Sequence, residues 1–362
     1  MTSIFERIAE LEAGGRRFAL ATVVRTDGST PQVVGAKMVV VDDEERGRAA
    51  GTLGGGCVEA DAIDAARAVL AGGGRSLRAY ELTEDLAWNT GLVCGGTMWI
   101  LAEPGGDALS AAGGSLVGRL ASAARGHDPL AIVTLLRRSG RDVAFGGRVF
   151  VDADGRLTGS LGDAALDARA VDAAVVQLRH GSARTVAMDE GRDLLVDPVT
   201  SRPSLVIAGG GHVAQAIARQ ARLVEFDVTV LEDRPEFADP ARFGGATVVE
   251  GDVPSTLASL DYGWNGFVVI ATRGHKLDAD CVLAAARSNA RYIGLLGSRR
   301  KTVLIEAMLR EAGVPAERLA AIHAPVGLDL GGRTPAEIAL SVLAEITQLR
   351  YRATGAPLSK RA

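Results

Sequence analysis

The stretch Gly51–Ile63, GTLGGGCVEADAI, is a glycine-rich turn followed by the start of a predicted helix. A run typical of a strand, Lys37–Val41, precedes it, and a run typical of a helix, Val58–Leu70, follows it. Glycines just before a helix let an anion approach the free backbone N–H groups, and the helix dipole adds partial positive charge there. The same setting favours the thiolate form of Cys57, which is the better metal ligand and nucleophile. Taken alone, the stretch is explained equally well by a tight turn with a buried cysteine.

The composition indicates a globular protein of more than one domain. The chain has 362 residues, of which 47% are hydrophobic and 23% are charged, and its net charge is −4. This charge argues against nucleic acid or an anionic membrane as a partner. Residues 1–15 are typical of a charged amphipathic helix and not of a signal peptide, and no apolar run approaches the roughly 20 residues of a membrane span. Three cysteines are too few for a disulfide framework. We therefore expect a cytoplasmic protein.

The sequence contains an internal repeat. The matching segments are 51–66 with 159–174, 19–25 with 131–137, 35–42 with 147–152, and 99–104 with 194–198. The first of these pairs aligns without a gap, GTLGGGCVEADAIDAA with GSLGDAALDARAVDAA. We therefore predict an α+β unit over residues 1–104, a second and degenerate unit over 128–200, and a Gly/Ala/Ser-rich connector over 105–127.

The two copies differ at the glycine turn. The first has Gly-Gly-Cys at 55–57 where the second has Asp-Ala-Ala at 163–165. Because the second copy is predicted to fold with Asp-Ala-Ala, folding alone does not require Gly-Gly-Cys. The first copy also contains a segment that the second lacks, residues 89–96 (NTGLVCGG), which places Cys94 just before two glycines. These differences indicate a functional site in the first copy and a structural role for the second.

The candidate residues of this site are those whose chemistry suits the binding of an anion or a metal ion. Two cysteines without histidines or C-x-x-C spacing do not form a structural zinc site. Cys57 and Cys94 are instead candidates to ligate a soft metal together, or one of them carries a transferable sulfur. The turn 28–31 (GSTP), with Gly35 and Lys37, either lines the same anion site or is a hairpin turn with an exposed lysine. The candidates are Gly54, Gly55, Gly56, Cys57, Glu59, Cys94, Gly95, Gly96 and Lys37.

The C-terminal half follows a different pattern, that of a dinucleotide-binding fold. A short apolar strand, 204–208, leads into GGGHVA at 209–214 and a helical run, and a second strand, 228–231, ends in an acid pair. A G-x-G-x-x-A sequence between strand and helix, with an acid a little over twenty residues later, is the fingerprint of this fold. We predict a Rossmann-like parallel-sheet domain over 201–352 and a loose tail over 353–362.

Ligands of such sheets bind beyond the carboxyl ends of the strands. The first glycine of the fingerprint permits the turn, the second lets the backbone approach a phosphate, and the alanine lets the helix pack closely. Either Glu232 or Asp233 would hold a ribose hydroxyl, and His275 with Asp278 forms an acid/base pair or a loop hydrogen bond. A Rossmann-type fold without a nucleotide is the structural alternative. The candidates are Gly209, Gly211, His212, Ala214, Glu232, Asp233, Thr272, His275, Asp278, Gly297, Ser298, Arg299 and Arg300.

Several longer motifs together resemble the XdhC/CoxI family of xanthine dehydrogenase accessory proteins over nearly the whole chain. They are GTLGGGCVEA at 51–60, CGG at 94–96, VIAGGGHVA at 206–214, GHKLD at 274–278, YIGLLGSRRK at 292–301 and HAPVGLDLGGRTPAEIALSVLAEI at 323–346. The resemblance implies a cytoplasmic maturation factor that binds molybdenum cofactor. Such a factor is an accessory protein and not an enzyme. The resemblance further implies that the cofactor is held for sulfuration and inserted into a molybdenum hydroxylase of the xanthine or CO dehydrogenase type. One departure is Arg273, where a more acidic loop is expected.

The residue chemistry is compatible with this resemblance. The phosphate of molybdopterin suits a glycine turn at a helix N-terminus, and molybdenum suits the soft sulfur of Cys57 or Cys94. The implied partners are the hydroxylase client and a cysteine desulfurase as sulfur donor, and a homodimer stays open. Two other functions also stay open. One is an NAD(P)-dependent oxidoreductase with His275 as acid/base, and the other is a nucleotide sensor that gates cofactor release.

Overall fold

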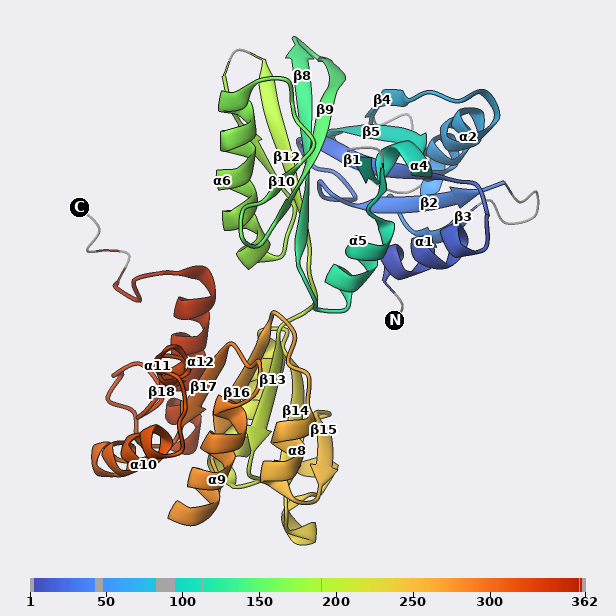
Figure 1. Cartoon of the computed structure of the whole chain (residues 1–362). Helices are drawn as coiled ribbons and strands as arrows, with labels where there is room; N and C mark the ends of the chain where they lie inside the picture. Colours follow the sequence, from blue (N-terminus) through green and yellow to red (C-terminus); the bar gives the residue numbers. More distant parts are fainter. Residues whose placement is uncertain are drawn as a thin grey trace. The chain divides into compact units, whose positions relative to one another are not determined.

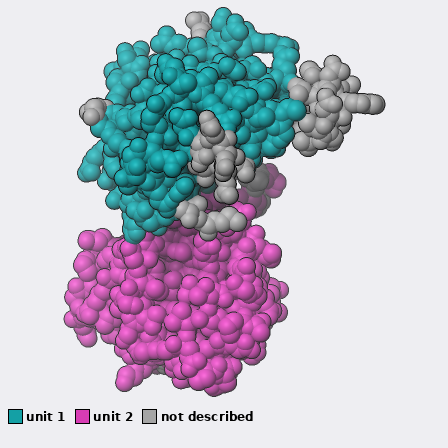
Figure 2. All heavy atoms as spheres, turned by 90° about the vertical axis from the view of Figure 1, so that its right-hand side faces the viewer, with its two compact units in different colours: residues 1–200 teal, residues 201–362 magenta. Residues whose placement is uncertain are grey.

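The chain folds into two compact units, unit 1 over residues 1–200 and unit 2 over residues 201–362 (Figure 2). The computed structural model describes residues 3–42, 48–82, 95–111, 114–189, 191–357 and 359. The predicted fold class is confirmed, because unit 1 contains two related α+β halves and unit 2 has a parallel sheet of the Rossmann type (Figure 1). Within the described ranges, no helix is long and apolar enough to cross a membrane.

Unit 1 contains two five-stranded antiparallel sheets of the same topology. The first has the order β3-β2-β1-β5-β4 and the second the order β10-β9-β8-β12-β11. The strands of the first are β1 (Phe18–Asp27), β2 (Lys37–Val41), β3 (Arg48–Gly51), β4 (Ser76–Glu81) and β5 (Thr97–Pro104). Those of the second are β8 (Leu130–Ser139), β9 (Asp142–Asp152), β10 (Leu157–Thr158), β11 (Arg184–Ala187) and β12 (Arg192–Val199). Helix α2 (Gly56–Gly72) packs on the first sheet and α6 (Ala164–His180) on the second (Figure 1).

The segment between the two halves, predicted as a connector, is folded. It contains α4 (Gly105–Ala108), the short strands β6 (Ser110–Ala111) and β7 (Gly114–Ser115), and α5 (Val117–Ala124). Helix α5 packs against the N-terminal helix α1 (Ile4–Ala13), which starts with a capping box and buries Phe5, Ile8 and Leu11. These apolar side chains give the connector a core to pack on.

Two reciprocal ion pairs join the halves of unit 1. Lys37 in β2 pairs with Asp197 in β12, and Arg148 in β9 pairs with Glu103 in β5 at 2.6 Å. Lys37 and Arg148 occupy equivalent places in their sheets, and Glu103 and Asp197 each precede a proline in equivalent strands. Each half therefore contributes one cation and one carboxylate, as in an isologous interface between two copies of one protein.

Unit 2 contains a six-stranded sheet with the order β15-β14-β13-β16-β17-β18, parallel throughout. Numbered along the chain, this is the 3-2-1-4-5-6 order of a Rossmann fold. The strands are β13 (Ser204–Ala208), β14 (Asp227–Glu232), β15 (Thr247–Glu250), β16 (Gly266–Ile270), β17 (Tyr292–Leu295) and β18 (Ile322–His323). Their carboxyl ends share one edge, where the predicted ligand residues lie.

Helices cover both faces of this sheet. They are α7 (His212–Leu223), α8 (Val253–Ser259), α9 (His275–Ala286), α10 (Arg299–Glu311), α11 (Ala316–Leu319) and α12 (Pro335–Tyr351), with short 3-10 helices η1 (Pro235–Phe237) and η2 (Pro240–Phe243). Residues of α7 and α12 pack in one core and residues of α8, α9 and α10 in another. Cys281 is fully buried in the second core. Gly274 caps α9 and places His275 and Asp278 in its first turn.

Candidate functional site

An acidic side chain closes the glycine turn before α2. The carboxylate of Glu59 accepts three hydrogen bonds from the turn 52–55, with distances of 2.6, 2.9 and 3.1 Å. In the second half of unit 1, Asp167 accepts the equivalent bonds from residues 160–161 at 2.8 and 2.7 Å. The two turns therefore share one construction. Glu59 was predicted to contact a cofactor, but the structure commits its carboxylate to holding the turn.

The two turns differ in how they cap the following helix. The N-cap of α6 is Asp163, whose carboxylate accepts from the N–H groups of Ala165 at 2.7 Å and Leu166 at 3.1 Å. The N-cap of α2 is Gly55, which offers no side-chain hydrogen bond. Cys57 follows at the second position of α2 with an exposed thiol. The start of α2 thus lacks the carboxylate that satisfies the start of α6, which leaves this position suited to an external anion.

The turn 28–31 lies against two other glycine segments of the predicted site. A Cβ atom on Gly54 would lie 3.0 Å from the Cβ of Pro31, and one on Gly28 would lie 3.0 Å from the Cα of Gly96. Both glycines have positive φ angles, +106° and +70°. The structure therefore brings GSTP, the GGGC turn and Gly95–Gly96 together, although they are far apart in the sequence.

Two other residues, Lys37 and Cys94, were predicted to belong to this site. The ammonium group of Lys37 is buried, pairs with Asp197 and donates to the carbonyl of Gly35 at 2.9 Å. Lys37 was predicted to line the anion site or to be exposed, and the structure shows neither, because its charge is used to join the halves of unit 1. Cys94 lies outside the described residues, so its role as a ligand stays a prediction.

Gly96→Ala is expected to lower the free energy of unfolding of unit 1 by about 1–3 kcal/mol, the usual cost of overpacking. The new methyl group would meet the backbone oxygens of Asp27 and Ser29 at 2.5 Å, and backbone cannot easily move away. Gly95→Ala is the matched control, because nothing lies within 4 Å of its added Cβ. Urea denaturation of both variants checks this, and equal effects of the two would contradict the packing described.

The fingerprint of unit 2 has the expected backbone geometry. Gly209 has φ +107°, and a Cβ there would lie 2.5 Å from the carbonyl oxygen of Ala271. Gly211 caps α7 without a side-chain hydrogen bond, so the first N–H groups of the helix, starting at His212, face the carboxyl edge of the sheet. Ala214 is fully buried between α7 and the sheet. These features support a phosphate at the start of α7.

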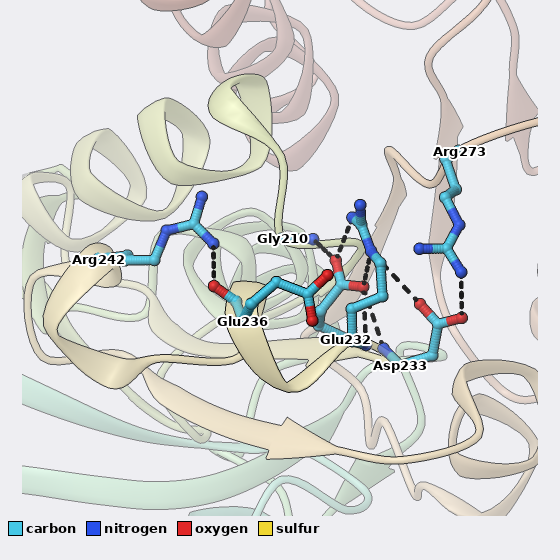
Figure 3. A network of polar contacts seen from close by, with 7 residues as sticks. Gly210, Glu232, Asp233, Glu236, Arg242 and Arg273 are labelled. Carbon is cyan, nitrogen blue, oxygen red and sulfur yellow. Dashed lines mark hydrogen bonds and ion pairs between the residues drawn. The ribbon is translucent and has the colours of Figure 1, made fainter.

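Glu232, one of the two acids predicted to hold a ribose, is buried at the end of β14 (Figure 3). Its carboxylate accepts the N–H of Gly210 at 2.6 Å and a two-pronged contact from Arg234 at 2.9 and 3.0 Å. The backbone N–H groups of Asp233 and Arg234 add two bonds at 3.1 Å. Burial raises the pKa of Glu232, but these hydrogen bonds outweigh burial and lower it to about 2. Glu232 is therefore ionised and fully engaged.

Asp233, the other acid, is more exposed to solvent. About a third of its side chain is exposed, and its Oδ2 atom pairs with Arg273 at 3.0 Å. The Glu232 carboxylate beside it, and then burial, raise the pKa of Asp233. Arg273 follows β16, and β14 and β16 flank β13 on either side. The pair therefore reaches from one neighbour of β13 to the other at the ligand edge.

Glu232 makes the stability of unit 2 depend on pH. Its folded-state pKa of about 2 lies below the ordinary value of 4.5, so the unfolded chain binds the proton more readily. The contribution of Glu232 is therefore complete above pH 4.5 and is lost as the pH falls toward 2. The difference in unfolding free energy between the wild type and Glu232→Gln should shrink over this window. Urea denaturation at a series of pH values measures it, and a constant difference would contradict the assignment.

Asp278 makes contacts other than the predicted pairing with His275. Its side chain is buried, accepts from the hydroxyl of Thr272 at 2.6 Å and forms an ion pair with Lys301. This pair links the first turns of α9 and α10, so the carboxylate serves the loop structure. The side chain of His275 lies outside the described residues.

The segment 297–300 lies beyond the end of β17, at the predicted edge. Ser298 caps α10 by accepting from the N–H of Lys301, and Arg299 and Arg300 are exposed in the first turn. Their guanidinium groups are suited to a phosphate or carboxylate approaching this edge. Within the described part of the chain, no three His, Cys, Asp or Glu side chains are grouped closely enough to hold a metal ion.

The sequence interpretation missed a polar cluster between β17, β18 and α12. Glu345 accepts from the hydroxyl of Tyr292 at 2.6 Å and from the N–H of Gly327 at 3.0 Å, and it lies 3.4 Å from Nδ1 of His323. The rings of Tyr292 and His323 stack with centroids 4.7 Å apart. Burial raises the pKa of Glu345, but its hydrogen bonds lower it overall. The available signal was an acid beside Ile346 on the apolar face of the last helix.

Comparisons with known proteins cover both units. Residues 205–346 match the family described as XdhC Rossmann domain, and residues 11–81 match the XdhC and CoxI family. The Escherichia coli K12 protein "Uncharacterized protein YqeB" is 33% identical over 248 residues, which cover 64% of this chain and 46% of that protein. The chain thus spans less than half the length of that relative.

Two Bacillus proteins align over more of the chain. A Bacillus subtilis 168 protein, named as a probable xanthine dehydrogenase subunit, is 27% identical over 342 residues, which cover 92% of this chain and 93% of that protein. A crystal structure from Bacillus halodurans, described as a xanthine dehydrogenase, has a TM-score of 0.50 at 22% identity and covers 98% of both chains. At this identity, the structural likeness shows the fold alone.

Proposed function

Because the chain belongs to the XdhC/CoxI family, we propose that it is an accessory protein that binds molybdenum cofactor for a molybdenum hydroxylase. The two family matches fall in unit 1 and unit 2, respectively. The name of the Bacillus subtilis relative supports a client of the xanthine dehydrogenase type. In this proposal a cysteine desulfurase supplies sulfur to the held cofactor in the cytoplasm, before insertion.

The asymmetry between the two halves of unit 1 carries this proposal. The start of α6 is satisfied by the carboxylate of Asp163, whereas the equivalent start of α2 has a glycine cap and the exposed thiol of Cys57. Molybdopterin carries a phosphate, which an uncapped helix start binds, and its molybdenum is suited to a soft sulfur ligand. The residues present therefore fit the cofactor.

Each residue of the turn has a task in this proposal. The first N–H groups of α2 would bind the phosphate, and Gly55 and Gly56 carry no side chains that would block its approach. Glu59 holds the turn closed, and the sulfur of Cys57 would ligate the metal. The turn 28–31 and Gly95–Gly96 form the adjoining wall. The cofactor, when bound, supplies the metal centre that the client enzyme requires.

Co-expression with the cofactor biosynthesis proteins tests the proposal. The purified chain is expected to contain molybdenum and molybdopterin in comparable, near-stoichiometric amounts. Molybdopterin is measured as its fluorescent oxidation product and molybdenum by mass spectrometry. A chain purified without either, from cells that make active molybdenum enzymes, would contradict cofactor binding.

We further propose that unit 2 binds an adenine nucleotide, NAD(P) or ATP, which gates release of the cofactor. The glycine loop, the start of α7 and the acids after β14 support binding. Saturating nucleotide should then raise the unfolding free energy by a few kcal/mol, measured as an increase in Tm. An unchanged Tm with all these nucleotides would contradict nucleotide binding.

The oxidoreductase alternative receives less support from unit 2. It has His275 as the acid/base, and Asp278, which was considered as the partner of His275, is instead bonded to Thr272 and Lys301. Robust nicotinamide turnover by the purified protein would favour this alternative over an accessory role.

A further inference from the structure

The two halves of unit 1 differ in the loop that joins their first two strands. In the first half, residues 28–36 connect β1 to β2, whereas in the second half Gly140 and Arg141 connect β8 to β9. The longer loop includes the turn 28–31, which lies against the GGGC turn at Gly54. The short hairpin of the second half cannot make this contact. The loop 28–36 is therefore a second feature, besides the glycine cap and Cys57, that sets the first half apart.

The far end of this loop packs on the second half of unit 1. Val34 lies in one apolar cluster with Leu136 and Leu195, which belong to β8 and β12. A Cβ atom on Gly35 would collide with the side chain of Ala183, just before β11. The loop therefore reaches from the GGGC turn of the first half to the sheet of the second.

Lys37 connects this loop to the GGGC turn. Its ammonium group pairs with Asp197 in β12 and donates to the carbonyl of Gly35 at 2.9 Å. Its backbone carbonyl accepts the N–H of Thr52 at 3.1 Å, and the hydroxyl of Thr52 accepts the N–H of Gly54 at 3.2 Å. One residue thus contacts both the loop and the turn, and a carboxylate of the second half pairs with its charge.

The reciprocal ion pair holds a different segment. Arg148 pairs with Glu103 and donates to the carbonyl of Ala108 at 2.7 Å and to the hydroxyl of Thr134 at 3.1 Å. Ala108 ends α4 and Thr134 lies in β8, so these contacts lie outside the loop and the GGGC turn. The side chains are 7% and 12% exposed in the Lys37 pair and 10% and 2% exposed in this one. The two pairs therefore resemble each other in burial and differ in the segment that they hold.

We propose that Asp197 is a positioning residue for the cofactor site of unit 1, which acts through Lys37 and the loop 28–36. In this role the second half of the unit fixes one wall of a site that the first half contains. Without the carboxylate, the buried ammonium group of Lys37 would lack a counter-charge and would turn toward water, away from Gly35. The loop would then be free to leave the GGGC turn. This inference rests on the molybdenum cofactor binding proposed for unit 1.

The molybdopterin that co-purifies with Asp197→Asn and with Glu103→Gln tests the inference. Each substitution removes one carboxylate charge from a reciprocal pair and keeps the size of the side chain. Both should lower the Tm by similar amounts, because the two pairs are similarly buried. Only Asp197→Asn should lower the molybdopterin content of the folded protein, by about tenfold, the scale on which loss of an outer-shell partner weakens binding. Asp197→Glu should keep most of the cofactor, because Glu103 stands at the equivalent place in the first half.

A second pair of variants tests the same contact without leaving a buried charge unpaired. Val34→Ala and Val143→Ala remove the same methyl groups from the same apolar cluster, but Val34 lies in the loop 28–36 and Val143 lies in β9. Val34→Ala should lower the molybdopterin content to a level between those of the wild type and Asp197→Asn. Val143→Ala should leave it at the wild-type level.

Equal losses of molybdopterin from Asp197→Asn and Glu103→Gln would overturn the inference, since they would follow stability alone. Wild-type content in folded Asp197→Asn, or in Val34→Ala, would also overturn it. Absence of molybdopterin from the wild type would overturn the inference together with cofactor binding by unit 1. The wild-type content therefore tests the proposed function, and the differences between matched variants test the role of Asp197.

Discussion

Cys57→Ala is expected to remove most of the co-purifying molybdenum without destabilising the protein. The thiol is exposed at the start of α2, where the second half of unit 1 folds with Ala165 at the equivalent position. Alanine is therefore compatible with this turn and with the helix that follows. Molybdenum content should fall at least about tenfold, the scale on which metal affinity changes when a supporting group is lost. Mass spectrometry measures the metal, and thermal unfolding measures stability.

Cys281→Ala is the matched control for this experiment. Cys281 is fully buried in the core of unit 2, and burial raises the pKa of its thiol to about 12. A neutral, inaccessible thiol is a poor metal ligand. Its replacement should leave the molybdenum content unchanged and lower the unfolding free energy by about 1 kcal/mol, the cost of a small cavity. Full molybdenum content in Cys57→Ala would contradict a ligand role for Cys57.

Glu103→Ala is expected to lower the unfolding free energy of unit 1 by about 3–5 kcal/mol. The Glu103 side chain is 2% exposed and accepts two hydrogen bonds from Arg148, which is itself 10% exposed. Removing one partner of a buried pair leaves the other charge without compensation, and this cost is larger than the net value of the pair. Arg148 would keep its contacts with Thr134 and Ala108 but lose its counter-charge.

Glu81→Ala is the control for this variant, because Glu81 pairs with Arg141 at 3.1 Å on the surface. The side chains of this pair are 57% and 90% exposed, so solvent screens the interaction. Its loss should change the unfolding free energy by no more than about 0.5 kcal/mol. Urea denaturation compares the two variants. Similar small effects would show that the reciprocal ion pairs do not hold the halves of unit 1 together.

The architecture followed from the sequence because its signals are local and repeated. The ungapped match of 51–66 with 159–174 predicted two units of one topology, and the structure confirms equal strand orders. The fingerprint at 209–214 between strand and helix predicted the Rossmann-type sheet. Both signals depend on spacing within a few tens of residues, which a single sequence displays.

The contacts of individual polar residues could not be predicted from the sequence in the same way. Lys37 finds its partner Asp197 160 positions away, and no local pattern indicates which carboxylate it will meet. Glu232 stands where an acid is expected, but its engagement by Arg234 depends on how the loop after β14 folds back. The role of Glu59 was visible in retrospect, because Asp167 stands at the same place in the repeat without a predicted site.

Replacing the first turn by the sequence of the second turn tests the central claim most directly. In the triple variant Gly55→Asp, Gly56→Ala and Cys57→Ala, the first turn carries the sequence of 163–165, including the acid that caps α6. The account predicts a folded protein with less than about a tenth of the wild-type molybdopterin, because a carboxylate occupies the anion position. Its Tm should be lower than that of the wild type, because Gly55 and Gly56 have φ angles of +76° and +66°, which Asp and Ala adopt only with strain. Wild-type molybdopterin content in the folded variant would show that the cofactor is held elsewhere.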